Sequence, residues 1–146
     1  MSIISNLIDK KHLIQSLSAS IFVSLASTAV YAEGISTHVL DIENGVGKAN
    51  VPVTLSMQDN NDSWTDIGSA MTGENGRVES FGEDVAIEEG VYKLTFDMSD
   101  NMSDNMSDDE AFFPEIDVVF NVEDPDEHYH VPVIVSPYGY STYRGN

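Results

Sequence analysis

The sequence predicts an all-β fold, in the form of a sandwich of two packed sheets. Segments in which apolar and polar residues alternate with the period of a β-strand recur along most of the chain. Short turn segments with Gly, Asn or Pro separate them at regular intervals. Seven or eight short strands with such turns are typical of a sandwich, and 146 residues suffice for one domain with its own core.

The predicted strands share this alternation and end at turn residues. In chain order they cover residues 36–42, 51–57, 66–72, 77–81, 91–96, 116–122 and 129–135, with a last strand ending near residue 144. Segments 66–72 and 77–81 flank Gly73-Glu-Asn-Gly76, whose Asn-Gly pair favours a hairpin, so we expect these two strands to pair. A further turn is expected at Pro137-Tyr-Gly139, before the last strand.

Residues 1–32 have the composition of a secretory signal peptide. Lys10 and Lys11 precede an apolar run over residues 13–30, and Ala32 ends a pattern typical of a cleavage site. A transmembrane anchor is the alternative, but polar residues interrupt the run and no stop-transfer pattern follows it. We therefore expect cleavage after Ala32, export to the periplasm or the exterior, no membrane attachment after cleavage, and one domain over residues 33–146.

The chain is strongly acidic and contains no cysteine. Its formal net charge is −19, and residues 33–146 keep 24 of the 25 acidic side chains but only four of the six basic ones. Such a surface repels nucleic acids and anionic membranes, so we exclude both as partners. The absence of cysteine excludes disulfides and thiol catalysis. Stability is therefore expected to come from packing and from oligomerisation.

Residues 98–109 repeat a unit of four residues three times, Met-Ser-Asp followed by Asn or Asp. A period of four would place the three methionines on one face of a helix, but Ser, Asp and Asn favour turns over helix interiors. We favour an acidic loop, because the segment is polar and of low complexity. A calcium site at Asp100, Asp104 and Asp108 is a weaker alternative, since the glycine and the bidentate glutamate of a calcium-binding loop are missing.

Three histidines in residues 33–146 are candidates for acid–base chemistry, because histidine titrates near neutral pH. His38 lies in a predicted strand, and His128 and His130 are two residues apart, so on a strand they share one face. Histidines on strands are also found as satisfied core residues, and three of them could bind zinc. No cysteine is present and no carboxylate stands at ligand spacing, so we expect no metal and no other cofactor.

Only four basic side chains remain in residues 33–146, namely Lys48, Arg77, Lys93 and Arg144. Arg77 follows the predicted Asn-Gly turn and opens a strand. From there it could hold an oxygen-rich ligand, or it could pair with one of the many carboxylates. Arg144 lies in the aromatic C-terminal segment, which it could equally anchor to a neighbouring subunit.

The C-terminal segment 128–146 joins two histidines, an apolar strand, a Pro-Tyr-Gly turn and a Tyr-Arg-Gly sequence. Chain ends usually fray, so this density of aromatic and charged groups indicates a segment that is folded in and used. Together with Ser36-Thr-His-Val-Leu-Asp41 and Phe112-Phe-Pro-Glu115, it resembles the 5-hydroxyisourate hydrolases, the transthyretin-like enzymes of urate breakdown. The resemblance covers residues 35–146, and Asn146 stands where this family typically has a serine.

The resemblance implies a transthyretin-like sandwich of two four-stranded sheets, with a short helix after the fifth strand, where the repeat lies. It also implies a homotetramer, a dimer of dimers, with active sites at the dimer–dimer interface. The family's active positions fall on His38, Arg77, His130 and Tyr143, and its terminal serine falls on Asn146. The expected catalytic residues are therefore His38, Arg77 and His130. The expected substrate-binding residues are His38, Arg77, Tyr143 and Asn146.

The implied reaction hydrolyses 5-hydroxyisourate to 2-oxo-4-hydroxy-4-carboxy-5-ureidoimidazoline, through attack of water on a ring carbonyl. Direct attack is expected because the sequence offers neither a cysteine nucleophile nor a Gly-x-Ser-x-Gly motif. Either His38 or His130 would activate the water, while the other orients the substrate or returns a proton. Arg77 would stabilise the charge that develops on the carbonyl oxygen.

The main alternative is a non-enzymatic carrier of a small ligand, because transthyretin itself shares the implied fold. An exported structural or adhesive sandwich is a third possibility, although it would leave the histidines unexplained. A fold alone does not decide among these functions. His38, Arg77, His130 and the Tyr-Arg-Gly sequence favour the hydrolase.

Overall fold

The computed structural model of the chain describes residues 34–99 and 112–146. Within these ranges the backbone forms strands and turns and no helix, which confirms the predicted all-β class. The predicted signal peptide lies outside the described residues, as does the repeat beyond Ser99 together with the helix implied there. No helix of the described part is long and apolar enough to cross a membrane.

Nine strands form within the described ranges. They are β1 (Gly34–Asp41), β2 (Val46–Gly47), β3 (Pro52–Gln58), β4 (Trp64–Met71), β5 (Arg77–Val78), β6 (Gly90–Asp97), β7 (Glu115–Val122), β8 (His128–Ser136) and β9 (Gly139–Thr142). Each strand longer than two residues overlaps a strand expected from the sequence. The alternation of apolar and polar residues was therefore a sound guide to where strands form.

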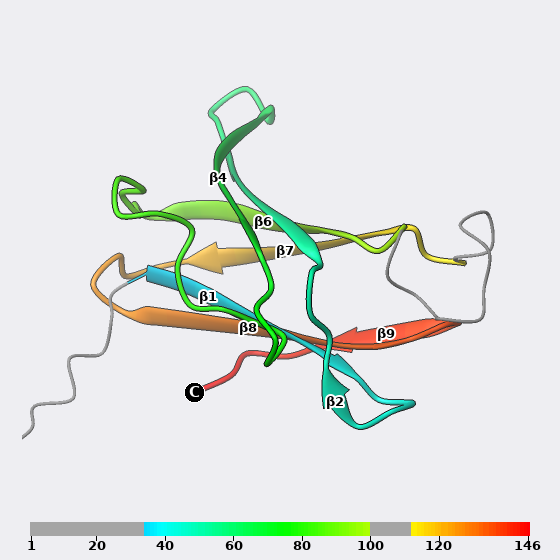
Figure 1. Cartoon of the computed structure of the whole chain (residues 1–146). Helices are drawn as coiled ribbons and strands as arrows, with labels where there is room; N and C mark the ends of the chain where they lie inside the picture. Colours follow the sequence, from blue (N-terminus) through cyan, green and yellow to red (C-terminus); the bar gives the residue numbers. More distant parts are fainter. Residues whose placement is uncertain (1–33, 100–111) are drawn as a thin grey trace, which may run out of the picture. The chain divides into compact units, whose positions relative to one another are not determined.

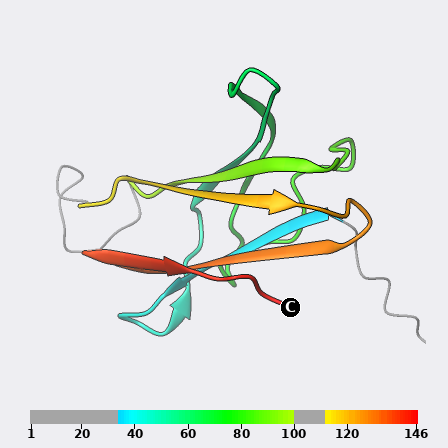
Figure 2. The ribbon, with the colours of Figure 1, turned by 180° about the vertical axis from the view of Figure 1, so that it is seen from behind.

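The strands are arranged in two layers (Figures 1 and 2). One sheet has the order β2-β1-β8-β9, with the short strand β5 paired to β1, and the other has the order β4-β3-β6-β7. The two four-stranded sheets implied by the resemblance are thus confirmed, with β5 as an addition to the first. β1 and β8 run parallel, although the four strands of the second sheet lie between them in the sequence.

The predicted hairpin between residues 66–72 and 77–81 is wrong. The turn at residues 73–76 forms and is closed by a backbone hydrogen bond of 2.8 Å, but it carries the chain from one sheet to the other. β4 pairs with β3, whereas β5 pairs with β1. Gly76 accounts for this path: its φ is 76°, and a Cβ there would lie 2.5 Å from the carbonyl oxygen of Val39. The backbone of the turn therefore packs directly on β1, which a residue with a side chain would prevent.

The apolar faces of the two sheets meet in one core. The buried hydrophobic side chains of β1 and β8 are Ile35, Val39, Tyr129, Val131, Val133 and Val135, and those of the second sheet include Val53, Leu55, Tyr92, Leu94, Phe96, Ile116, Val118 and Val122. The Tyr92 hydroxyl donates to the carbonyl oxygen of Glu88 at 3.0 Å, and the Tyr129 hydroxyl accepts from the amide of Asp124 at 3.0 Å. Both buried tyrosines are thus satisfied. Because side chains alternate along a strand, the intervening residues of β1 and β8 point to the outer face of the first sheet.

Candidate functional site

The outer face of the first sheet gathers the residues that the sequence singled out. β1 contributes Ser36 and His38, β8 contributes His128 and His130, and the short strand β5 contributes Arg77. Ser36 lies opposite His130 in the parallel pairing of β1 and β8, and His38 lies opposite Arg77 in the pairing of β1 and β5. The three predicted catalytic residues therefore come from three strands that lie side by side in one sheet.

The turn before β5 fixes the position of Arg77. The side-chain oxygen of Asn75 accepts a hydrogen bond of 3.0 Å from the backbone amide of Arg77. The carbonyl oxygen of Gly76 accepts one of 2.8 Å from the amide of Val39, which belongs to β1. The Asn-Gly sequence thus attaches the arginine to the strand that carries His38.

Arg77 takes part in none of the ion pairs found within residues 34–99 and 112–146. These pairs are Lys48–Asp41 at 3.6 Å, Lys93–Asp117 at 3.3 Å and Arg144–Glu127 at 2.9 Å. The alternative role of Arg77, an ion pair with a carboxylate, is therefore not observed in the described part of the chain. Its exposed side chain beside His38 can present two parallel N–H donors to an oxygen-rich ligand.

Burial and positive charge favour the neutral form of both candidate catalytic histidines. Burial is the largest cause that lowers the pKa of His38 below 6.5, and the charge of Arg77 lowers it further, against a backbone hydrogen bond and Glu79. Burial also leads in lowering the pKa of His130, followed by Arg77 and the two neighbouring histidines, while Glu79 opposes. At neutral pH each imidazole is thus available to take a proton from water.

A buried serine joins the two histidines of β8, which share one face as expected. Ser36 Oγ lies 2.8 Å from Nε2 of His128 and 2.8 Å from Nδ1 of His130. Ser36 is only 3% exposed. Sequence reasoning missed Ser36, because its place depends on the register between two strands that are far apart in the chain. Among the described residues no group of three or more His, Cys, Asp or Glu could hold a metal ion.

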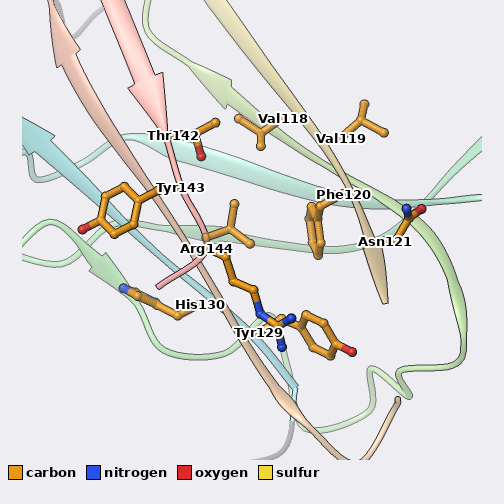
Figure 3. Close-up of a pocket in the computed structure, with 10 residues that line it drawn as sticks. Val118, Val119, Phe120, Asn121, Tyr129, His130, Thr142, Tyr143 and Arg144 are labelled. Carbon is orange, nitrogen blue, oxygen red and sulfur yellow. The ribbon is translucent and has the colours of Figure 1, made fainter. Parts of the chain in front are cut away.

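The C-terminal segment runs along β8, in agreement with the expectation that it is folded in. β9 pairs with β8, and beyond it Gly145 forms a bridge with His130, donating its amide to the His130 carbonyl oxygen at 2.8 Å. Figure 3 shows the Tyr143 ring and the His130 imidazole on one side of this segment and the Arg144 guanidinium on the other. Tyr143 therefore stands beside a candidate catalytic histidine, and Asn146 is the exposed residue that follows the bridge.

The contacts of Arg144 tie the C-terminal segment to its own chain. Its guanidinium lies 2.9 Å from a carboxylate oxygen of Glu127 and is centred 5.2 Å from the middle of the Tyr129 ring. The ion pair is largely exposed, so it contributes little to stability by itself. The arginine serves here as a local anchor.

A mostly apolar cavity of about 240 Å³ opens between β7 and the C-terminal segment (Figure 3). Its lining comprises Val118, Val119, Phe120, Asn121, Tyr129, His130, Val131, Thr142, Tyr143 and Arg144. The cavity shares His130 and Tyr143 with the candidate site but includes neither His38 nor Arg77. The candidate site is therefore the outer face of the first sheet, where His38, Arg77 and His130 meet.

Known proteins of one family match this chain in sequence and in fold. The HIUase/transthyretin family matches residues 35–145. A probable 5-hydroxyisourate hydrolase of Caenorhabditis elegans is 41% identical over 123 residues, covering 84% of this chain and 89% of the relative. The 5-hydroxyisourate hydrolase of Salmonella dublin is 34% identical over 138 residues, covering 94% and 99%. Transthyretin from Sparus aurata has a TM-score of 0.68 at 23% identity, covering 76% of this chain and 95% of that one, which shows the fold alone.

Proposed function

The chain belongs to the HIUase/transthyretin family, and from this premise we propose that its outer-face residues hydrolyse 5-hydroxyisourate. Curated relatives that bear the name of this hydrolase match it over nearly their whole length, which makes the chain an enzyme of the same reaction, in urate breakdown. The observation that carries the assignment of the site is the meeting of His38, Arg77 and His130 from three strands on one face. A carrier would need none of these groups at that place.

The proposed mechanism uses neutral imidazole as the base. His130 or His38 takes a proton from water, and the resulting hydroxide attacks a ring carbonyl of the substrate. Arg77 donates hydrogen bonds to the carbonyl oxygen, whose negative charge grows during the attack. The ring C–N bond then breaks, the leaving nitrogen receives the proton, and 2-oxo-4-hydroxy-4-carboxy-5-ureidoimidazoline is formed.

The C-terminal segment supplies the remaining proposed contacts with the substrate. The Tyr143 ring stands beside His130 (Figure 3), where it can cover one side of a planar ring. Asn146 follows the bridge that Gly145 makes with His130. Its amide both donates and accepts hydrogen bonds, so it can take the place of the serine hydroxyl typical of the family.

Assay with synthesised 5-hydroxyisourate tests the proposal directly, and its pH dependence tests the base. The base must be neutral, and burial and Arg77 lower the pKa of His38 and His130 below 6.5. Activity should therefore persist as the pH falls through 6.5 and disappear only at lower pH, where the imidazoles become protonated. An acid limb above pH 6.5 would contradict this base assignment. Absence of hydrolysis, combined with tight binding of the intact compound, would favour the carrier.

We further propose that the chain is exported to the periplasm or exterior, loses residues 1–32, and assembles as a dimer of dimers. The n-region, apolar run and cleavage pattern support export. The lack of cysteine is consistent with stability gained through packing and assembly, and membership of the family supports the four-subunit form. Native mass spectrometry of the exported protein measures both its first residue and its number of subunits. We expect four subunits that each begin at Glu33, whereas a cytoplasmic monomer that retains Met1 would contradict the proposal.

A further inference from the structure

We propose that Ser36 and His128 are positioning residues that select which ring nitrogen of His130 is free to act as the base. The inference rests on the proposed function, which it deepens: it assigns the activation of water to Nε2 of His130. Neither Ser36 nor His128 needs to touch the substrate for this role. They act through the hydrogen bond that reaches the other nitrogen of the His130 ring.

The geometry places one hydroxyl between two imidazoles. Ser36 Oγ is 2.8 Å from His128 Nε2 and 2.8 Å from His130 Nδ1, both within the range of good hydrogen bonds. The serine is 3% exposed, so water has little access to compete for its hydroxyl. The parallel pairing of β1 and β8 places Ser36 directly opposite His130. The hydrogen-bonded link His128–Ser36–His130 (the serine bridge) therefore depends on the register of the sheet.

A serine hydroxyl carries a single hydrogen, so it can donate to only one of its two partners here. If Ser36 donates to Nε2 of a neutral His128, it accepts the Nδ1 hydrogen of His130. Nε2 of His130 then keeps its lone pair and can accept a proton from water. If Nε2 of His128 instead carries a hydrogen, it donates to Ser36, which leaves the serine hydrogen to be donated to Nδ1 of His130. Nε2 of His130 then carries the hydrogen and cannot act as a base.

The surroundings of His130 favour its neutral form, so the choice lies between the two neutral tautomers of its ring. Arg77 and Glu79 act on its imidazole from β5 and the segment after it, His38 acts from β1, and His128 acts from β8 itself. Burial and Arg77 together outweigh Glu79 and favour the uncharged ring. For a neutral imidazole, the hydrogen bond made by one ring nitrogen decides the state of the other.

The C-terminal segment also contacts the His130 ring, and its arginine is engaged elsewhere. Gly145 packs against His130, and the charge of Arg144 is paired with Glu127. The hydrogen bond at Nδ1 is thus the contact through which a neighbouring titratable side chain, His128, reaches His130. This contact gives the serine bridge its control over the tautomer.

Removal of the hydroxyl in the full-length chain tests the bridge. In Ser36→Ala we expect kcat to fall by about tenfold or more, with KM changed much less, because the correct tautomer of His130 is no longer selected. The imidazole ¹⁵N signals of His130 should shift from one tautomer toward a mixture. Ser36→Thr, which retains the hydroxyl, should restore both. Ser136→Ala is the matched control, since it removes a hydroxyl of β8 that donates instead to the Gly139 carbonyl oxygen at 3.0 Å.

Substitution of His128 tests whether its hydrogen bond with Ser36 controls the bridge. His128→Gln supplies an amide oxygen that can still accept from Ser36, so kcat and the ¹⁵N signals of His130 should be retained. His128→Leu should behave like Ser36→Ala. Unchanged ¹⁵N signals and an unchanged pH profile in Ser36→Ala would overturn the proposal. If the unmodified protein fails to hydrolyse 5-hydroxyisourate, the proposed function falls, and the ¹⁵N signals still decide whether the bridge selects the tautomer.

Discussion

Replacement of Arg77 by alanine is expected to lower kcat/KM for 5-hydroxyisourate by about 10²–10³-fold, because it removes the donors aimed at the developing oxyanion. The exposed guanidinium lies opposite His38 and forms none of the ion pairs of the described residues. Removal of the Arg77 side chain therefore breaks none of the ion pairs of the described residues. Circular dichroism should show an intact fold, and the whole effect should appear in steady-state kinetics.

His38→Ala and His130→Ala should also lose activity with the fold preserved, by about 10²–10⁴-fold each.

Two further variants separate geometry from charge at Arg77. Arg77→Lys retains the positive charge but not the planar pair of donors, so it should recover only part of the activity. Lys93→Ala makes the same change in net charge on the second sheet, where Lys93 pairs with Asp117 at 3.3 Å, and should leave kcat/KM within a few-fold. Near-normal activity of Arg77→Ala, or an equal loss in Lys93→Ala, would place the substrate elsewhere.

Local patterns in the sequence predicted most of what places the site. Alternation located each of the longer strands, and the two-residue spacing of His128 and His130 predicted their common face, because both follow from the pleat of a single strand. The resemblance supplied His38, Arg77 and His130 as a set. The structure adds that β1, β5 and β8 are neighbours in one sheet, so the set is contiguous.

The features that local patterns did not predict depend on contacts between distant segments. The Asn-Gly turn at residues 73–76 was expected to close a hairpin, but Gly76 packs on β1 and directs β5 to the other sheet. Ser36 gave no sign of a role, because its two partners lie more than ninety positions away and meet it only through the parallel register. Register between distant strands is set by the packed core, and no short segment encodes it.

The glycine of the Tyr-Arg-Gly sequence is required by the imidazole beside it. A Cβ at position 145 would lie 2.4 Å from Cδ2 of His130, a distance that atoms in real structures essentially never show. Alanine at this position must therefore displace either the C-terminal segment or the ring. Cδ2 is bonded to Nε2, the nitrogen assigned to activate water, so the displacement acts where the chemistry occurs.

We expect Gly145→Ala to lower kcat by about 10²-fold, since a shift of about 1 Å in a reacting group has an effect of this size. The free energy of unfolding should change little, because position 145 lies outside the apolar core. Gly139→Ala is the matched control in the same segment, where a Cβ would meet only Ser136 Oγ, at an ordinary 3.7 Å, and it should retain activity. Steady-state kinetics and thermal unfolding of both variants provide the measurement. Full activity of Gly145→Ala would show that neither the ring position of His130 nor its contact with the C-terminal segment is needed for catalysis.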